Sequence, residues 1–232
     1  MEIFWIMAIP LIGGLLLALF GYHRHAPELN AVMSFGTFVA SAFLTARVIT
    51  DGPITAMSEQ FFVDSFNVFL VALTAFVGFT TSNFSRPYMR HEVERGRHTD
   101  RRLRLYHSMY QGFQFAMLLA LSTNNLGVLW VAMEAATLTT VLLVSLYRTP
   151  ESIEAAWKYF ILCGVGIAQA LFGTVLLYFA AEQKLGAERD DTLPWSALHA
   201  NAAGLDPTAP SLASVSLRVG YGTPAGLVPL HG

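Results

Sequence analysis

The chain has 232 residues, of which 54% are hydrophobic and 13% are charged, and its formal net charge at pH 7 is −2. Few soluble domains combine so much apolar content with so little charge, and the net charge argues against a nucleic-acid partner. The single cysteine, Cys163, excludes an internal disulfide and a thiolate metal set. The composition therefore predicts an all-α membrane protein.

Six apolar segments lie along the chain. A helix rises ~1.5 Å per residue, so ~20 apolar residues cross the ~30 Å hydrocarbon core of a bilayer. No Lys or Arg precedes the first segment, which favours an uncleaved helix over a signal peptide. These segments predict one polytopic bundle over residues 1–232, with about six transmembrane helices and an incomplete seventh at Leu212–Gly232. They are Ile3–Phe20, Leu29–Ile49, Phe66–Phe84, Tyr106–Ser122, Leu126–Leu146 and Trp157–Ala181.

Two polar stretches between these segments are predicted to lie outside the bilayer. Gly52–Ser65 is too polar to span a membrane and is predicted to be a loop. Residues 182–211 are rich in polar residues, Pro and Ala and are predicted to form an outer loop, with a short interfacial helix at Trp195–Ala203.

The segment 85–108 holds half of the 14 Lys and Arg residues of the chain. Because loops rich in Lys and Arg stay on the cytoplasmic side, we expect this Arg-rich loop inside the cell, the N-terminus outside, and the chain in a bacterial-type inner membrane. Two interpretations remain open: the arginines dock an acidic peripheral subunit or anionic lipid headgroups, or they only fix the topology. They are Arg86, Arg90, Arg95, Arg97, Arg101, Arg102 and Arg104.

Glu134 is the only charged residue of the 21-residue segment Leu126–Leu146. It lies eight residues into the predicted helix, ~12 Å from its start. An ionised carboxylate facing lipid there costs at least ~2.5 kcal/mol, so this side chain faces protein or water, pairs with a cation or stays protonated. A buried carboxyl that takes up and releases a proton is what a proton relay requires. The alternative is a protonated carboxyl that hydrogen-bonds neighbouring helices together.

Further polar residues lie near Glu134 in the predicted hairpin. Lys158 is separated from Glu134 by ~12 Å of depth, which one or two waters bridge, although a lysine in the first turn of a helix also snorkels to the interface. Thr137 and Gln169 are candidates for binding water or neighbouring helices. Gly166, Ala170 and Gly173 form a stripe of small residues that favours close helix packing, and its partner is expected on another membrane subunit.

The run LWVAMEAATLTTVLLVSLYR, followed by EAAWKYFILCGVGIAQALFGTVLLYFA, resembles the antiporter-like proton-translocating membrane subunits of respiratory complex I (NADH-quinone oxidoreductase) and group 4 hydrogenases. The nearest likeness is to component F of hydrogenase-4 complexes, over its N-terminal part. The resemblance implies that Glu134 matches the helix-five glutamate of the family's proton line. It also implies that Lys158 matches a lysine at the start of helix six.

The block LRVGYGTPAGLVPLHG resembles the family's GYGTKAGLxPLHxWLPDAH. Pro224 stands where the family usually has its helix-seven lysine, and His231 is a further candidate for the relay. The chain ends inside a block that family members continue, so the resemblance covers about the first half of a family member. Both departures question whether this polypeptide pumps protons by itself.

The leading hypothesis is a membrane subunit of a hydrogenase-4-like or NADH:quinone oxidoreductase complex that couples electron transfer to proton translocation. Its expected partners are other membrane subunits, a peripheral redox arm, the lipid bilayer and protons. The sequence has no phosphate loop, CxxC pair or HExxH, so we expect neither a cofactor nor a catalytic centre of its own, and redox chemistry is expected on partners. The alternatives are a cation/proton antiporter subunit and a truncated structural or assembly subunit without transport.

Overall fold

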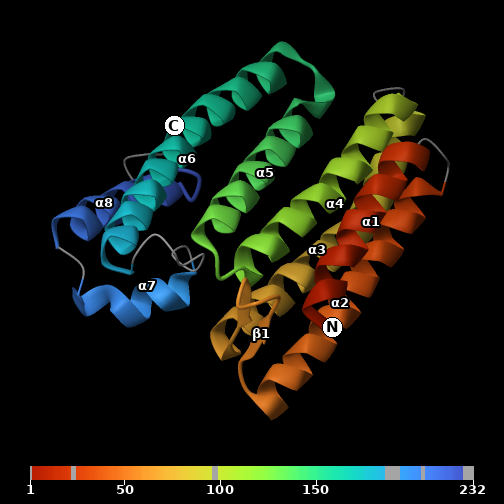
Figure 1. The fold of residues 1–232 in the computed structure, drawn as a ribbon. Coiled ribbons are helices and arrows are strands. Elements are labelled where there is room, and N and C mark those ends of the chain that lie inside the picture. Colours follow the sequence, from red (N-terminus) through yellow and green to blue (C-terminus); the bar gives the residue numbers. More distant parts are fainter. Residues whose placement is uncertain (1, 22–24, 96–98, 186–193, 205–206, 227–232) are drawn as a thin grey trace.

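The structure, a computed structural model, describes residues 2–21, 25–95, 99–185, 194–204 and 207–226. In these ranges the chain is almost entirely helical, with one short β-hairpin (Figure 1). The elements are α1 (Glu2–Phe20), α2 (Ala26–Asp51), β1 (Ile54–Ala56), β2 (Phe61–Val63), α3 (Ser65–Glu94), α4 (Asp100–Ser122), α5 (Leu126–Val144), η1 (Ser145–Tyr147), α6 (Pro150–Leu185), α7 (Trp195–Asn201), η2 (Ala202–Gly204) and α8 (Thr208–Gly222).

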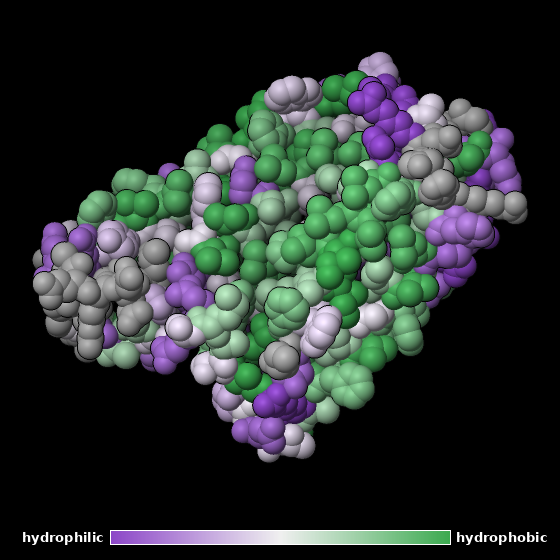
Figure 2. Space-filling model, turned by 45° about the vertical axis from the view of Figure 1, so that its right-hand side comes forward, coloured by the Kyte–Doolittle hydropathy of each residue, from purple (hydrophilic) through white to green (hydrophobic). Residues whose placement is uncertain are grey.

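The all-α membrane bundle predicted from the sequence is confirmed. Within the described ranges, α1, α2, α3, α5 with η1, and α6 are long and apolar enough to cross a bilayer. Helix α4 has 23 residues but a lower hydropathy, because it carries arginines at its start and buried polar side chains along its length. Figure 2 shows a broad apolar surface between hydrophilic ends, as a bilayer requires.

The helices run back and forth between two ends of the bundle (Figure 1). Helices α1 to α4 pack together, α5 packs between α4 and α6, and α8 packs on α6. One end carries the connection between α3 and α4 and the turn between α5 and α6; we call it the arginine end. The opposite end, which we call the hairpin end, carries the β-hairpin and α7.

Two neighbouring asparagines join the elements of the hairpin end. Asn124 donates from Nδ2 to the Glu59 carbonyl (2.9 Å) and to the Ser196 hydroxyl of α7 (2.8 Å). Asn125 donates to Gln60 Oε1 (2.9 Å) and caps α5 by accepting from two backbone N–H groups. The stretch Gly52–Ser65, expected as a loop, forms the β-hairpin, and the expected interfacial helix is present as α7 and η2.

The Arg-rich segment 85–108 is helical over most of its length, which corrects the expectation of a loop. Helix α3 continues to Glu94 and α4 begins at Asp100, so only residues 95–99 separate them. Arg, Glu and Leu favour helices, so the helix continues through the charged residues. A span predicted from hydropathy alone ends where the charges begin, although the helix itself does not. Arg86 and Arg90 consequently face α2, where both pair with Glu28.

The small-residue stripe of α6 is covered by α8 of the same chain. A Cβ added at Gly220 of α8 would lie 2.5 Å from the Ala170 nitrogen, and one added at Gly173 would lie 2.9 Å from the Ala213 carbonyl oxygen. Small residues allow this backbone-to-backbone approach. The expectation that a second subunit fills this stripe is therefore wrong. The docking of Thr208–Gly222 onto α6 could not be expected from the sequence, which carries no signal for it.

Candidate proton-relay site on α5 and α6

Helix α5 presents Glu134 near its middle. Asn125 starts the helix by accepting from Gly127 N (2.8 Å) and Val128 N (3.2 Å). Glu134 then lies about 12 Å along the axis from Leu126 and about 15 Å from Val144. The carboxyl therefore lies near the middle of an apolar helix that is long enough to cross a bilayer.

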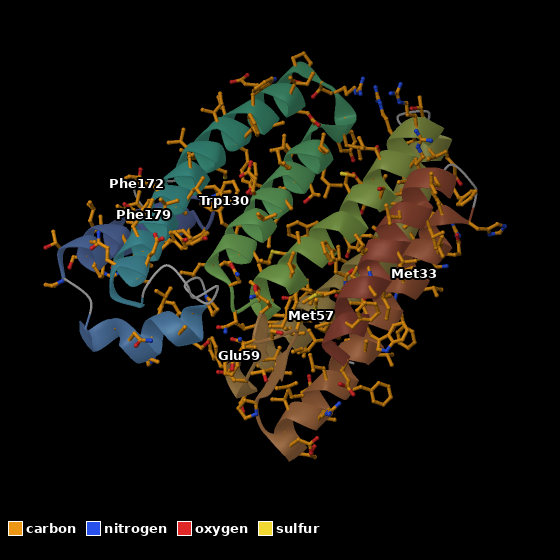
Figure 3. All side chains as sticks on the ribbon, in the orientation of Figure 1. Met33, Met57, Glu59, Trp130, Phe172 and Phe179 are labelled. Carbon is orange, nitrogen blue, oxygen red and sulfur yellow. The ribbon has the colours of Figure 1, made fainter. Side chains whose placement is uncertain are left out.

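The pairing of α5 with α6 determines what Glu134 faces. Trp130 Nε1 donates to the Ile167 carbonyl (2.8 Å), and Figure 3 shows Trp130 between the two helices. One turn further along α5, the Glu134 carboxyl is near enough to the Cys163 thiol to act on it electrostatically. Four residues forward on α5 thus correspond to four residues back on α6, as in an antiparallel pair. Glu134 is half-buried on the side of α5 that faces α6.

None of the described residues forms a hydrogen bond or an ion pair with Glu134. The interhelical contact expected of a purely structural, protonated carboxyl is therefore not made within the described part of the chain. The Glu134 carboxyl is thus half-buried and has no fixed partner among the described residues.

Lys158 lies on the outer surface of α6. Its side chain is 75% exposed, and its ammonium pairs with Glu154 one turn away (2.5 Å). The helix pairing sets Lys158 opposite Thr139, about 8 Å along the axis from Glu134. The structure does not bring these two side chains together, and the exposed position matches a lysine that snorkels.

The other candidates have separate surroundings. Thr137 is buried, and its hydroxyl donates to the Met133 carbonyl of its own helix (3.1 Å). Gln169 is exposed on α6 and donates to the Ser216 hydroxyl of α8 (3.1 Å), so it joins α6 to α8. Pro224 lies in the turn after α8, half-buried. His231 lies outside the described residues.

A second polar cluster, less apparent from the sequence, lies between α2 and α4. Gln111 is fully buried and donates from Nε2 to Asn30 Oδ1 (2.8 Å), the Asn30 carbonyl (3.1 Å) and the Ser34 hydroxyl (2.9 Å). Ser34 in turn donates to Gln114 Oε1 (3.3 Å). The three-residue spacing of Gln111 and Gln114 already predicts that both face another helix. Their partners were not predictable, because Asn30 and Ser34 are isolated polar residues in an apolar segment.

We predict that Gln111→Leu destabilises the helix bundle. The substitution removes the donor and leaves the buried Asn30 Oδ1 without this bond, which costs about 1–3 kcal/mol. Chemical unfolding in mixed micelles, followed by tryptophan fluorescence, measures the loss. Gln169→Leu is the matched control, because Gln169 is exposed and makes one side-chain bond. Equal loss in both variants would contradict a special role for the cluster.

Metal ligation has no support in the described residues, where no three His, Cys, Asp or Glu side chains gather. The α5–α6 site presents one half-buried carboxyl, that of Glu134.

Residues 123–232 match a family of transmembrane segments described as NADH:quinone oxidoreductase/Mrp antiporter. The chain is 46% identical over 227 residues to a hydrogenase-4 component F homolog of Methylacidiphilum infernorum, covering 98% of this chain and 46% of that relative. It is 28% identical over 206 residues to F(420)H(2) dehydrogenase subunit N of Methanosarcina mazei, covering 86% of this chain and 36% of the relative. The chain thus spans less than half the length of these relatives.

Two solved structures share the fold. A chain of the membrane-bound sulfane sulfur reductase, an archaeal respiratory membrane complex, superimposes with a TM-score of 0.81 at 19% identity and covers 98% of this chain and 45% of its own length. A chain of respiratory complex I from Thermus thermophilus gives a TM-score of 0.68 at 22% identity and covers 97% of this chain and 45% of its own length. At these identities the likeness concerns the fold alone.

Proposed function

Because the chain belongs to the antiporter-like family of membrane subunits, found in NADH:quinone oxidoreductases, Mrp antiporters and hydrogenase-4 complexes, we propose that it serves a respiratory oxidoreductase complex as a proton-translocating membrane subunit. Glu134 is the group that takes up and releases the proton. The observation that carries this assignment is a half-buried carboxyl near mid-membrane with no hydrogen bond or ion pair from the described residues. Proton uptake by vesicles that contain Glu134→Gln tests it.

The proposed mechanism separates electron transfer from proton transfer. Oxidation and reduction take place on a peripheral redox arm, and this chain responds through neighbouring membrane subunits. A change in the charge or the water near Glu134 alters its proton affinity, so that the carboxyl loads from one side and releases to the other. Lys158 does not contact Glu134, because its ammonium is paired with Glu154. It affects the proton affinity of Glu134 only through its charge, from a distance.

Pro224 supports a second candidate, a structural or assembly subunit without transport. The chain has a proline at the position where the family it resembles usually has a lysine on helix seven. A proline neither carries charge nor donates a backbone hydrogen bond.

A third candidate is a cation/proton antiporter subunit. It uses the same Glu134 and differs only in its partners.

We propose that the arginine end faces the cytoplasm and that the hairpin end, with the N-terminus, faces outward. The clustering of arginines at one end of the bundle supports this orientation.

Labelling of single cysteines tests the orientation. We expect Arg95→Cys to react with a membrane-impermeant maleimide only in inside-out vesicles and Gln183→Cys only in right-side-out vesicles, since both positions are exposed at opposite ends. Native Cys163 is buried and gives little background. Labelling of both positions from the same side would overturn the orientation and the number of spans.

A further inference from the structure

We propose that a pocket at the arginine end binds the phosphate of an anionic phospholipid. The pocket has a volume of about 530 Å³ and lies between the end of α1, the first turns of α4 and the turn between α5 and α6. Its lining consists of Ala18, Thr99, Arg101, Arg102, Arg104, Leu105, Ser108, Met109 and Arg148.

Four arginines contribute to this pocket, three from α4 and one from the turn after α5, and no acidic side chain is among the described residues that line it. Of these, Arg101, Arg104 and Arg148 form no ion pair with a described residue. Arg86 and Arg90, by contrast, pair with Glu28 within the chain. Guanidinium groups match phosphate oxygens because their N–H donors form a planar fork that binds two oxygens at once. The N-terminal end of the α4 dipole adds positive potential to the same pocket.

The backbone holds two of these arginines in place. The Arg104 side chain packs across the end of α1, where a Cβ added at Gly21 would lie 3.1 Å from Arg104 Cγ. Arg148 adopts a left-handed conformation (φ 54°) after η1, which turns the chain from α5 into α6. The cations thus converge from elements that the fold itself positions, and the pocket does not depend on a freely moving tail.

The remainder of the pocket identifies the occupant as a lipid. Below the arginines its wall is apolar, with Ala18, Leu105 and Met109. On α1 the apolar surface continues away from the arginine end through exposed Leu15 and Leu11. An amphiphile with a phosphate at the rim and acyl chains along α1 satisfies both halves, whereas a free phosphate or an acidic protein segment satisfies only the upper half.

Native mass spectrometry of the chain in mild detergent, with the subunits that copurify, tests the proposal. We expect dioleoyl phosphatidylglycerol to bind at least about tenfold more tightly than dioleoyl phosphatidylcholine at low ionic strength. The double variant Arg101→Gln/Arg148→Asn should weaken phosphatidylglycerol binding about 25-fold, at roughly fivefold for each arginine. Asparagine tolerates the left-handed conformation at position 148, so the turn is preserved.

Single substitutions separate the pocket from the general charge of this end. Arg101→Gln should weaken binding about fivefold, whereas Arg95→Gln, an exposed arginine of the same end outside the pocket, should have no effect. Equal weakening by both would overturn the proposal in favour of nonspecific attraction. Complete displacement of phosphatidylglycerol by inorganic phosphate would overturn the proposal in favour of a free anion. Loss of a copurifying subunit with lipid binding unchanged would overturn it in favour of a protein partner.

Discussion

Glu134→Gln is expected to abolish proton translocation while the complex still assembles. Glutamine keeps the shape of the side chain and most of its hydrogen-bonding capacity but removes the titratable proton. Loss of an essential proton-transfer group lowers a rate by about 100-fold or more, so proton uptake should fall below detection. The measurement is quenching of a pH-sensitive dye in inside-out vesicles during oxidation of the electron donor, with subunit content determined on the same membranes.

Companion variants sharpen this test. Glu134→Asp should retain part of the proton uptake, because it still titrates but is shorter by one methylene. Lys158→Ala should have a small effect, because its ammonium pairs with Glu154 on the outer surface of α6. Pro224→Lys places a cation where the family usually has one; gain of proton uptake in that variant would identify this chain as a disabled pump.

Unchanged proton uptake in Glu134→Gln membranes that contain the assembled complex would exclude the relay role. Loss of the complex itself would instead assign Glu134 to helix packing, which the absence of a hydrogen bond from the described residues argues against. Electron transfer to an artificial acceptor provides the internal control, since the proposal places redox chemistry on other subunits.

The sequence predicts most of the bundle because a membrane imposes one strong rule, that about 20 consecutive apolar residues form a spanning helix. Leu126–Leu146 and Trp157–Ala181 obey this rule, and α5 and α6 lie there. The rule fails where a helix leaves the bilayer, as α3 does when it continues into charged residues up to Glu94. It also weakens for α4, whose polar side chains are buried against other helices rather than exposed to lipid.

The candidate site was only partly predictable. A lone carboxyl in an apolar segment identifies Glu134 directly, since burying a charge is costly. The surroundings of that carboxyl depend on the rotation of α5 and α6 about their own axes in the packed pair, which decides which residues of each helix face the other. The proximity of Cys163, the bond between Trp130 and Ile167, and the outward orientation of Lys158 follow from this rotation, which composition and spacing do not determine.

The docking of α8 onto α6 is a second such feature. It depends on Gly220, where an added Cβ would lie 2.5 to 2.7 Å from the nitrogen, Cβ and Cα atoms of Ala170. The obstructing atoms are backbone and Cβ atoms, which cannot rotate away. A single methyl group at position 220 therefore has to push the two helices apart. Gln169 and Ser216, which hydrogen-bond across the same interface, would separate with them.

Gly220→Ala is accordingly expected to undock α8. Overpacking of this kind costs about 1–3 kcal/mol, which raises the undocked population roughly 5- to 150-fold. A reporter cysteine at Ser216, which is 1% exposed in the docked state, should then react with N-ethylmaleimide faster by a similar factor. Cys163→Ala is included in every variant so that only the reporter reacts.

Gly164→Ala is the matched control, because Gly164 lies on α6 and an added Cβ there meets nothing within 4 Å. It adds the same methyl group to the neighbouring helix and should leave the reaction at position 216 unchanged. Equal rates in Gly220→Ala and Gly164→Ala would show that the contact between α6 and α8 does not depend on close backbone approach. A faster reaction in Gly220→Ala alone would establish that the small-residue stripe holds α8 within this chain.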